Sequence, residues 1–175
     1  MVIGGNKGYR SSNKVFQVDE CMNNLLFHSK MNTGRVGHSA VLVRNKDIYV
    51  VGGYNSDKNE WLASVESCEN AFEGDEHTKK YWSGMTPMNE ARYYFGCCTW
   101  GSDFIFVFGG MNDRFMVADL PENQSKCLNS IERYNVDCNR WDSIDLKTYQ
   151  KFAFCSYLVA IHLPWDKDRI LIVGG

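Results

Sequence analysis

The chain has 175 residues, of which 44% are hydrophobic and 14% aromatic, and its formal net charge is −2. This size and apolar content allow one domain with a sizeable core, whereas the mixed charges argue against nucleic acid or an anionic membrane as an obligatory partner. No apolar run approaches the roughly 18 residues of a transmembrane helix, and the first residues lack the basic region and apolar core of a signal peptide.

The first predicted element, MVIGG at Met1–Gly5, begins a pattern that recurs at Asp47–Gly53, Asp103–Gly110 and Asp168–Gly175. Each copy is a short apolar run without polar alternation, so we expect a strand buried on both faces. Each run ends in two glycines, which allow positive φ or the close approach of another backbone. These pairs are Gly4 and Gly5, Gly52 and Gly53, Gly109 and Gly110, and Gly174 and Gly175. Their spacing indicates an internal repeat of roughly 50 residues.

Between the glycine pairs, each repeat contains the same predicted elements in the same order. The first repeat has an alternating and an outer strand within Val15–Leu26, and a further strand at Val36–Val43. The second has the alternating strand Ser64–Phe72, the inserted loop Glu73–Lys80, an outer strand marked by Trp82, and the strand Tyr93–Trp100. The third has the polar loop Met111–Lys126. Three strands follow it, at Ser130–Val136, Arg140–Leu146 and Phe152–Leu163. We therefore predict four strands per repeat and no helix.

This order of motifs resembles the kelch-repeat family, whose pattern is a strand ending in Gly-Gly, then Glu-x-Tyr, Trp and Met-x-x-x-Arg. The third repeat matches with Gly109, Gly110, Glu132, Tyr134 and Trp141. The second matches with Gly52, Gly53, Glu66, Trp82, Met88 and Arg92, but has Cys68 at the tyrosine position. The first supplies Met31 and Arg35 without the aromatic residues, and the last Met-x-x-x-Arg degenerates to Leu146 and Gln150. The resemblance spans the whole chain.

The resemblance implies an all-β, kelch-type β-propeller in which each repeat forms a blade of four antiparallel strands. The glycine-terminated strand would be the second from the axis, and Trp82, Tyr134 and Trp141 would fill the gaps between neighbouring blades. We expect a partial first blade at 1–34, a second at 35–91, a third at 92–149 and a partial last blade at 150–175. Radial packing would bury both faces of each blade.

About three blades make an incomplete ring, because propellers close with four to eight blades. We expect the rest of a longer chain to supply the remaining blades. The alternative is self-association, in which the last two strands of one copy meet the first three strands of another.

The seven cysteines are irregularly spaced and contain no C-x-x-C motif, so they resemble neither a secreted disulfide framework nor a zinc ribbon. We expect reduced cysteines in a cytosolic protein, most of them acting as small buried apolar groups, with a redox or metal role as the alternative.

The sequence contains no phosphate-binding loop and no G-x-S-x-G elbow, and its four histidines lack metal-ligand spacing. We therefore predict no catalytic residue, no cofactor and no metal site. His38 is expected to be a hydrogen-bonded core residue rather than a ligand. A kelch-fold enzyme similar to the copper oxidases, or a structural component of a large assembly, remains as an alternative.

The candidate binding residues lie in loops that the antiparallel order places on one face of the propeller. The loops are Asn6–Asn13, Tyr54–Trp61 and Met111–Lys126, and their large side chains include Tyr54, Trp61, Phe115 and Met116. Exposed aromatic and methionine side chains on rigidly held loops are typical of protein-binding surfaces. The alternative is that these loops fold back over the blade edges.

Arg35 and Arg92 enter the inner strands near the axis. In related kelch adaptors, basic residues at this place receive acidic peptides, and a guanidinium fork suits a carboxylate. The alternative is a structural pairing with Glu66 or Glu132 that holds neighbouring blades together.

These observations predict a non-catalytic protein-interaction module that recognises a protein partner through loops on one face. The resemblance implies a scaffold or an adaptor in the cytoplasm, or one associated with the cytoskeleton, but fold alone does not choose between these roles.

Overall fold

The computed structural model describes residues 1–19, 21, 23–74, 78–112, 127–145, 157–163, 165–166 and 168–174. In these ranges every regular element is a β-strand, which confirms the all-β prediction. No helix in the described part of the chain is long and apolar enough to cross a membrane.

Among the described residues, thirteen strands form four antiparallel sheets, which we call blades 1 to 4, and the other four strands form two separate hairpins. Blade 1 contains β1 (Val2–Ile3), β4 (Lys14–Val18) and β5 (Leu25–Lys30). Blade 2 contains β6 (Ser39–Val43), β7 (Asp47–Val51), β10 (Val65–Cys68) and β11 (Ser83–Met85). Blade 3 contains β12 (Gly96–Trp100), β13 (Phe104–Phe108), β14 (Ile131–Asn135) and β15 (Arg140–Ile144). Blade 4 contains β16 (Val159–His162) and β17 (Ile170–Val173).

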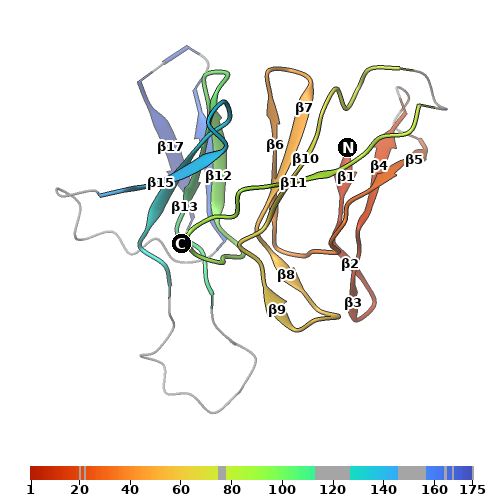
Figure 1. The fold of residues 1–175 in the computed structure, drawn as a ribbon, viewed down its shortest axis with the longest axis horizontal. Coiled ribbons are helices and arrows are strands. Elements are labelled where there is room, and N and C mark those ends of the chain that lie inside the picture. The colour runs from red at the N-terminus through yellow and green to blue at the C-terminus, as the bar shows by residue number, and fades with distance from the viewer. Residues whose placement is uncertain are drawn as a thin grey trace.

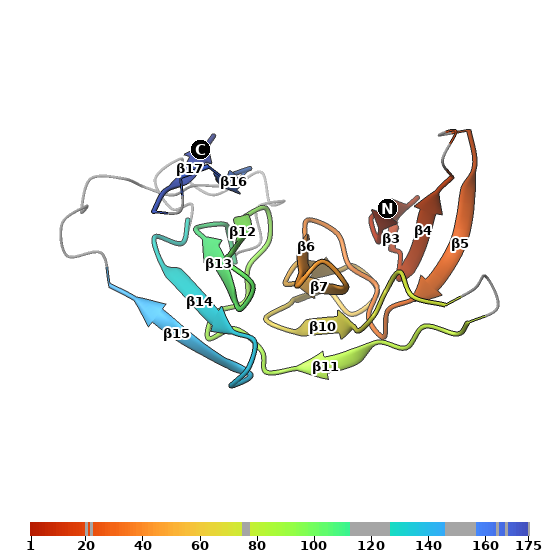
Figure 2. The same ribbon diagram turned by 90° about the horizontal axis from the view of Figure 1, so that it is seen from above.

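The blades stand side by side in an arc (Figure 1). Seen from above, β6 and β12 lie on the inner side of the arc, and β11 and β15 lie on its outer side (Figure 2). In blades 2 and 3 the strands pair in chain order from the inner to the outer side, so β7 and β13 are second, as predicted. The architecture is therefore part of a β-propeller.

The glycine pairs allow the backbone that links two blades to pass close to the end of the second strand. Gly52 and Gly53 follow β7 with φ values of 61° and 99°. A Cβ atom on Gly52 would lie 2.6 Å from the carbonyl oxygen of Arg92, and one on Gly53 would lie 2.8 Å from that of Val36. Both predicted roles, positive φ and close approach, are confirmed here.

The inner strands β6 and β12 are shorter than predicted, because a left-handed residue separates each from the preceding link; residues 152–156 of the third predicted inner strand lie outside the described residues. Gly37, Tyr94 and Tyr157 have φ values of 59°, 53° and 60° and stand just before β6, β12 and β16. The backbone N–H of Tyr94 donates to Gly37 O, and that of Tyr157 donates to Tyr94 O, both at 2.8 Å. These residues therefore connect successive blades instead of continuing the strands.

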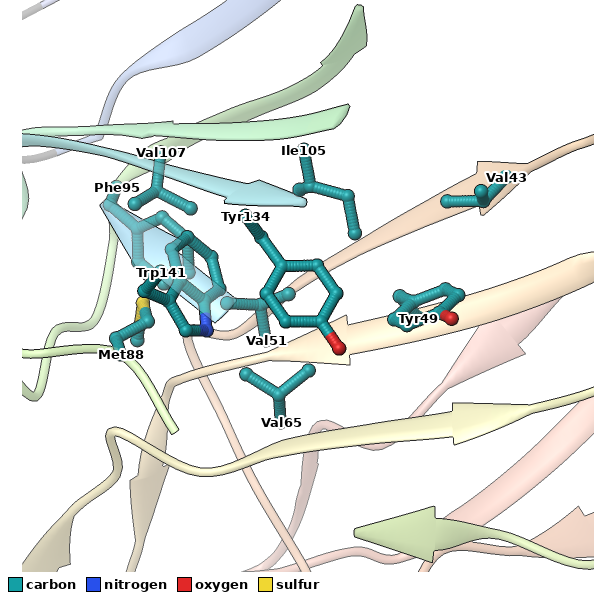
Figure 3. Packing of buried hydrophobic residues seen from close by; sticks show 10 residues of the cluster. All are labelled: Val43, Tyr49, Val51, Val65, Met88, Phe95, Ile105, Val107, Tyr134 and Trp141. Carbon is teal, nitrogen blue, oxygen red and sulfur yellow. The ribbon is translucent and has the colours of Figure 1, made fainter. Parts of the chain in front are cut away.

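The hydrophobic core lies between the blades. One cluster joins blades 2 and 3 and includes Tyr49, Val51, Val107, Tyr134 and Trp141 (Figure 3). A second cluster joins blades 1 and 2 and includes Val15, Met31, Ile48, Val50 and Trp82. A third joins blades 3 and 4 and includes Cys98, Phe108, Ile131, Leu158 and Ala160. The prediction that Trp82, Tyr134 and Trp141 fill the gaps between blades is confirmed.

Candidate protein-binding site

Two small hairpins extend from the same end of blades 1 and 2 (Figure 1). The first pairs β2 (Asn6–Lys7) with β3 (Arg10–Ser11), and the second pairs β8 (Tyr54–Asn55) with β9 (Glu60–Trp61). They occupy the two loops predicted at 6–13 and 54–61. Phe115 and Met116, in the third predicted loop, lie outside the described residues.

A reciprocal pair of serines ties the two hairpins together. The N–H of Ser11 donates to Ser56 Oγ at 2.6 Å, and the N–H of Ser56 donates to Ser11 Oγ at 2.7 Å. The two hydroxyl oxygens are 2.9 Å apart. Arg10 and Asp57 add an exposed ion pair at 3.9 Å. The hairpins of neighbouring blades are thus held at a defined separation.

Between the hairpins lies an open hollow of about 290 Å³ whose walls are polar. Its lining residues come from both hairpins and from the link that joins blades 1 and 2: Ser11, Asn13, Asn32, Thr33, Gly34, Asn55, Asp57 and Lys58. Asn55 is buried, donates to Gly34 O and accepts from the N–H of Lys58, both at 2.8 Å. Asn13 donates to Met31 O at 3.0 Å. Hydrogen bonds to backbone therefore hold the buried part of this lining in place.

Aromatic side chains lie on both hairpins. Tyr9, at the tip of the first hairpin, is 100% exposed. Tyr54 and Trp61 face each other across the second hairpin with ring centroids 5.3 Å apart, and both are half-buried. The binding role of Tyr54 and Trp61 stays a prediction. Sequence reasoning missed Tyr9, although its place after Gly8 in a predicted loop was an available signal.

Arg35 and Arg92 do not form a surface that receives acidic peptides, because both are fully buried. Arg35 donates to Glu66 Oε1 at 2.6 Å and to Gly52 O at 2.8 Å. Arg92 donates to Glu132 Oε1 at 2.6 Å and to Gly109 O at 2.7 Å. Burial lowers the pKa of Arg35, and the charge of Glu66 opposes that shift. The structure therefore shows the alternative reading, a structural pairing with glutamate.

The same ion pairs order the links between blades. Glu66 accepts the backbone N–H groups of Asn32 and Thr33 at 2.6 and 3.0 Å, in the link whose residues line the hollow. The backbone N–H of Arg35 donates to Ser12 O at 3.1 Å in blade 1, while its side chain binds blade 2. The pair thus joins neighbouring blades directly beneath the candidate site.

His38 follows this link in the chain and belongs to no metal-binding group among the described residues. Its ring lies beside Gly4, its backbone N and Cβ lie beside Gly53, and its Nδ1 is buried without a hydrogen-bond partner among the described residues. Backbone hydrogen bonds with Ile3 and Arg35 involve the ring, which agrees with the expectation of a hydrogen-bonded core histidine. Burial, and then the charge of Arg35, lower its pKa to about 4. Within the described ranges, no group of three His, Cys, Asp or Glu side chains could hold a metal ion.

The cysteines of the described residues differ in their exposure to solvent. Cys68 and Cys98 are buried, as expected, and burial raises the pKa of Cys98 to about 11. Cys21 and Cys138 are exposed, so the expectation of small buried groups holds for only part of the set.

Comparison with known proteins adds a family profile and several relatives. The profile described as the Kelch motif matches residues 34–67 and 91–144, together half of the chain. Kelch-like protein 28 of Mus musculus is 29% identical over 129 residues, which cover 71% of this chain and 20% of the relative. Kelch repeat and BTB domain-containing protein 12 of Homo sapiens is 29% identical over 104 residues, which cover 59% of this chain and 16% of the relative.

A third relative, Kelch-like protein 23 of Pongo abelii, is 28% identical over 153 residues, which cover 82% of this chain and 22% of the relative. The chain thus spans about a fifth of the length of the curated relatives it matches. Among solved structures, that of YjhT superposes with a TM-score of 0.58 and 14% identity, covering 83% of this chain and 35% of that one. This structural likeness concerns the fold.

Proposed function

This chain belongs to the kelch-repeat family, and from that membership we propose that it is a protein-interaction module. It recognises a protein partner at the hairpin face, which we define as the hairpins at 6–11 and 54–61 with the hollow between them. The observation that carries this proposal is the polar hollow between two hairpins that are tied to each other by Ser11 and Ser56. The names of the relatives, which include Kelch-like protein 28, support the family membership from which this proposal starts.

The proposed mechanism is display on a rigid support. The hollow offers amide and hydroxyl groups at its lining, and Tyr9 offers a large exposed ring at the tip of the first hairpin. Tyrosine is enriched in protein interfaces, because its ring buries a large area and its hydroxyl still forms a hydrogen bond. Since buried hydrogen bonds already order the hollow, a partner would lose little binding free energy to ordering it.

The proposal assigns no catalysis to the chain and places it in the cytosol. The unpaired thiols of Cys21, Cys68, Cys98 and Cys138 suit a reducing compartment.

The test is capture of partner proteins from a cell lysate, with each captured protein identified by mass spectrometry. We expect Tyr9→Ser together with Trp61→Ser to reduce recovery of the main partner about tenfold, since aromatic anchors contribute much of interface energy. Tyr81→Ser is the matched control, because Tyr81 is also exposed but lies in the connection between β10 and β11, away from the hairpins. Equal recovery with both variants would remove the hairpin face from the proposal.

We further propose that additional blades of a longer polypeptide cover the two ends of the arc. On the outer face of blade 4, Val159, Ile161, Leu171 and Val173 are exposed, and on blade 1 Val2, Leu25 and Phe27 are exposed. In blade 2 the residues of β7 are buried between neighbouring blades instead. The partial coverage of the YjhT structure by this chain supports further blades.

A further inference from the structure

Within the described residues, blade 1 has a free strand edge at the position where blades 2 and 3 have their inner strand. In blade 1, β1 is the terminal strand of the sheet order β1-β4-β5. In blades 2 and 3 the equivalent strands, β7 and β13, pair on that side with β6 and β12. A further strand can therefore extend blade 1 along β1.

The pairing register shows which residues of blade 1 are equivalent to those that bind the inner strands in blades 2 and 3. The N–H of Gly4 donates to Lys14 O, as that of Gly52 donates to Ser64 O and that of Gly109 to Ser130 O. Phe16 stands opposite Val2, as Glu66 stands opposite Val50 and Glu132 opposite Val107. Lys14 and Phe16 thus occupy the positions at which the other blades have serine and glutamate.

Those serine and glutamate residues form the receptor for the arginine that enters the inner strand. Ser64 Oγ and Glu66 Oε1 accept from Arg35 at 3.3 and 2.6 Å. Ser130 Oγ and Glu132 Oε1 accept from Arg92 at 3.0 and 2.6 Å. With Lys14 and Phe16 in their place, blade 1 offers an entering arginine a like charge and an aromatic ring.

The charge in blade 1 is doubled by the neighbouring strand. Lys14 stands directly opposite Lys30, both are exposed, and neither forms an ion pair within the described residues. Like charges directly opposite each other destabilise a strand pair. Phe16 and Phe27 pack edge to face beside them, with centroids 6.1 Å apart. This end of the blade face is thus cationic and apolar, the reverse of the equivalent place in blades 2 and 3.

We propose that the strand that completes blade 1 carries a carboxylate at the entry position where blades 2 and 3 carry Arg35 and Arg92. The carboxylate lies between Lys14 and Lys30 and relieves their repulsion, and the rest of the strand pairs with β1. This inference rests on the second part of the proposed function, that further strands cover the ends of the arc.

The test compares two dye-labelled peptides that bind the 175-residue chain. One peptide has the sequence of residues 35–43, and the other carries Arg35→Glu in that sequence. We expect the glutamate peptide to bind about tenfold more tightly by fluorescence anisotropy. The reversal of charge at this one residue replaces repulsion from Lys14 and Lys30 by attraction. This preference decreases in high salt, since exposed charges are screened.

Protein variants locate the preference. Lys14→Glu with Lys30→Glu reverses it in favour of the arginine peptide, whereas Lys46→Glu, at an exposed lysine in the β6–β7 turn, leaves it unchanged. The inference is overturned if the arginine peptide binds as tightly as the glutamate peptide, or if the preference survives the Lys14 and Lys30 substitutions. Absence of binding by both peptides overturns it together with the added blades. In that case the proposed binding at the hairpin face is still tested independently, by the capture experiment with the Tyr9 and Trp61 substitutions.

Discussion

Arg35 and Arg92 show how single residues hold this arc together. Burying two charges costs several kcal/mol per ion, and the cost is offset only where the remaining donors and acceptors are bonded. Glu132 meets this condition by accepting the N–H groups of Asn89 and Glu90 as well as the Arg92 guanidinium. The Nε atoms of both arginines lack a hydrogen-bond partner among the described residues, so the desolvation cost of the two guanidinium groups is not fully offset. We infer that the pairs fix the relative positions of neighbouring blades rather than maximise the free energy of unfolding.

Removing one partner of these pairs should be costly. We expect Glu66→Ala to destabilise the chain by about 3–5 kcal/mol in urea unfolding, because it leaves a buried guanidinium uncompensated. Glu132→Ala should destabilise the chain less, because Arg92 also lies 3.4 Å from the half-exposed carboxylate of Glu90. Thr33 occupies the equivalent position in the link before blade 2, so Arg35 has no such second carboxylate there. Equal losses for the two variants would show that Glu90 does not compensate.

His38 should make stability depend on pH. Its folded pKa of about 4 lies below the ordinary value of 6.5, so the unfolded chain binds the proton more readily. Stability from this residue is therefore complete above pH 6.5 and is lost as the pH falls towards 4. Between pH 7.5 and pH 5 we expect a loss of about 2 kcal/mol in denaturant unfolding.

His38→Asn is the control for that loss, because it removes the titrating ring. The variant should show a pH dependence smaller by about the same 2 kcal/mol. The carboxylates with lowered pKa values, Asp19, Asp103 and Asp142, act in a different window. Their stabilisation is lost only as the pH falls below their ordinary value of 3.8. An unchanged slope in His38→Asn would contradict the burial of a neutral ring.

At the scale of the element, β7 shows why an uninterrupted apolar strand belongs in this fold. Ile48 and Val50 pack with residues of blade 1, whereas Tyr49 and Val51 pack with residues of blade 3. The side chains of a strand alternate between two faces, and here both faces are interfaces. Blade 4 has the same apolar composition, but only its face towards blade 3 is covered.

The tryptophans near the outer strands should contribute strongly to packing between blades. Trp141 packs 5.1 Å from the Tyr134 ring and donates through Nε1 to Thr86 O at 2.9 Å in blade 2. We expect Trp141→Ala to cost about 3–5 kcal/mol in urea unfolding, the usual range for such a truncation. Trp165→Ala, at a residue that is 81% exposed, should change stability by less than about 0.5 kcal/mol. A loss under about 1 kcal/mol for Trp141→Ala would argue against its burial.

At the scale of the whole molecule, the arc presents two different kinds of surface. The hairpin face is polar, ordered and built from neighbouring blades. The two ends of the arc are apolar sheet faces of the kind that is buried between blades elsewhere. Large exposed apolar patches mark interaction sites or aggregation liabilities, so the ends should dominate the behaviour of the chain in solution.

We therefore expect the 175-residue chain to associate in a concentration-dependent manner and to bind a hydrophobic dye. Ile161 and Leu171 are paired across β16 and β17, and both are exposed. Replacing both by lysine should reduce association and dye binding, whereas Tyr9→Lys on the hairpin face should not. Light scattering that shows a monomer at all concentrations, together with no dye binding, would contradict the exposure of these faces and exclude the self-associated ring.

The repeat and its strands could be predicted from sequence because they depend on local patterns, since each hydrophobic run and its glycine pair lie within a few residues of one another. The strand order and the place of the tryptophans between blades followed instead from the resemblance to the kelch-repeat family. The inner-strand bounds were less predictable, since Tyr94 adopts a positive φ that its residue type disfavours.

The candidate site required the folded chain, because its parts meet only when two blades pack together. Ser11 and Ser56 are 45 residues apart, and neither carries a local signal of the other. Arg35 could be read as a surface cation or as a structural residue until its contact with Glu66, 31 residues away, showed it to be buried. Sequence patterns record the preferences of each segment, whereas the pairing of distant polar groups depends on the geometry that packing imposes.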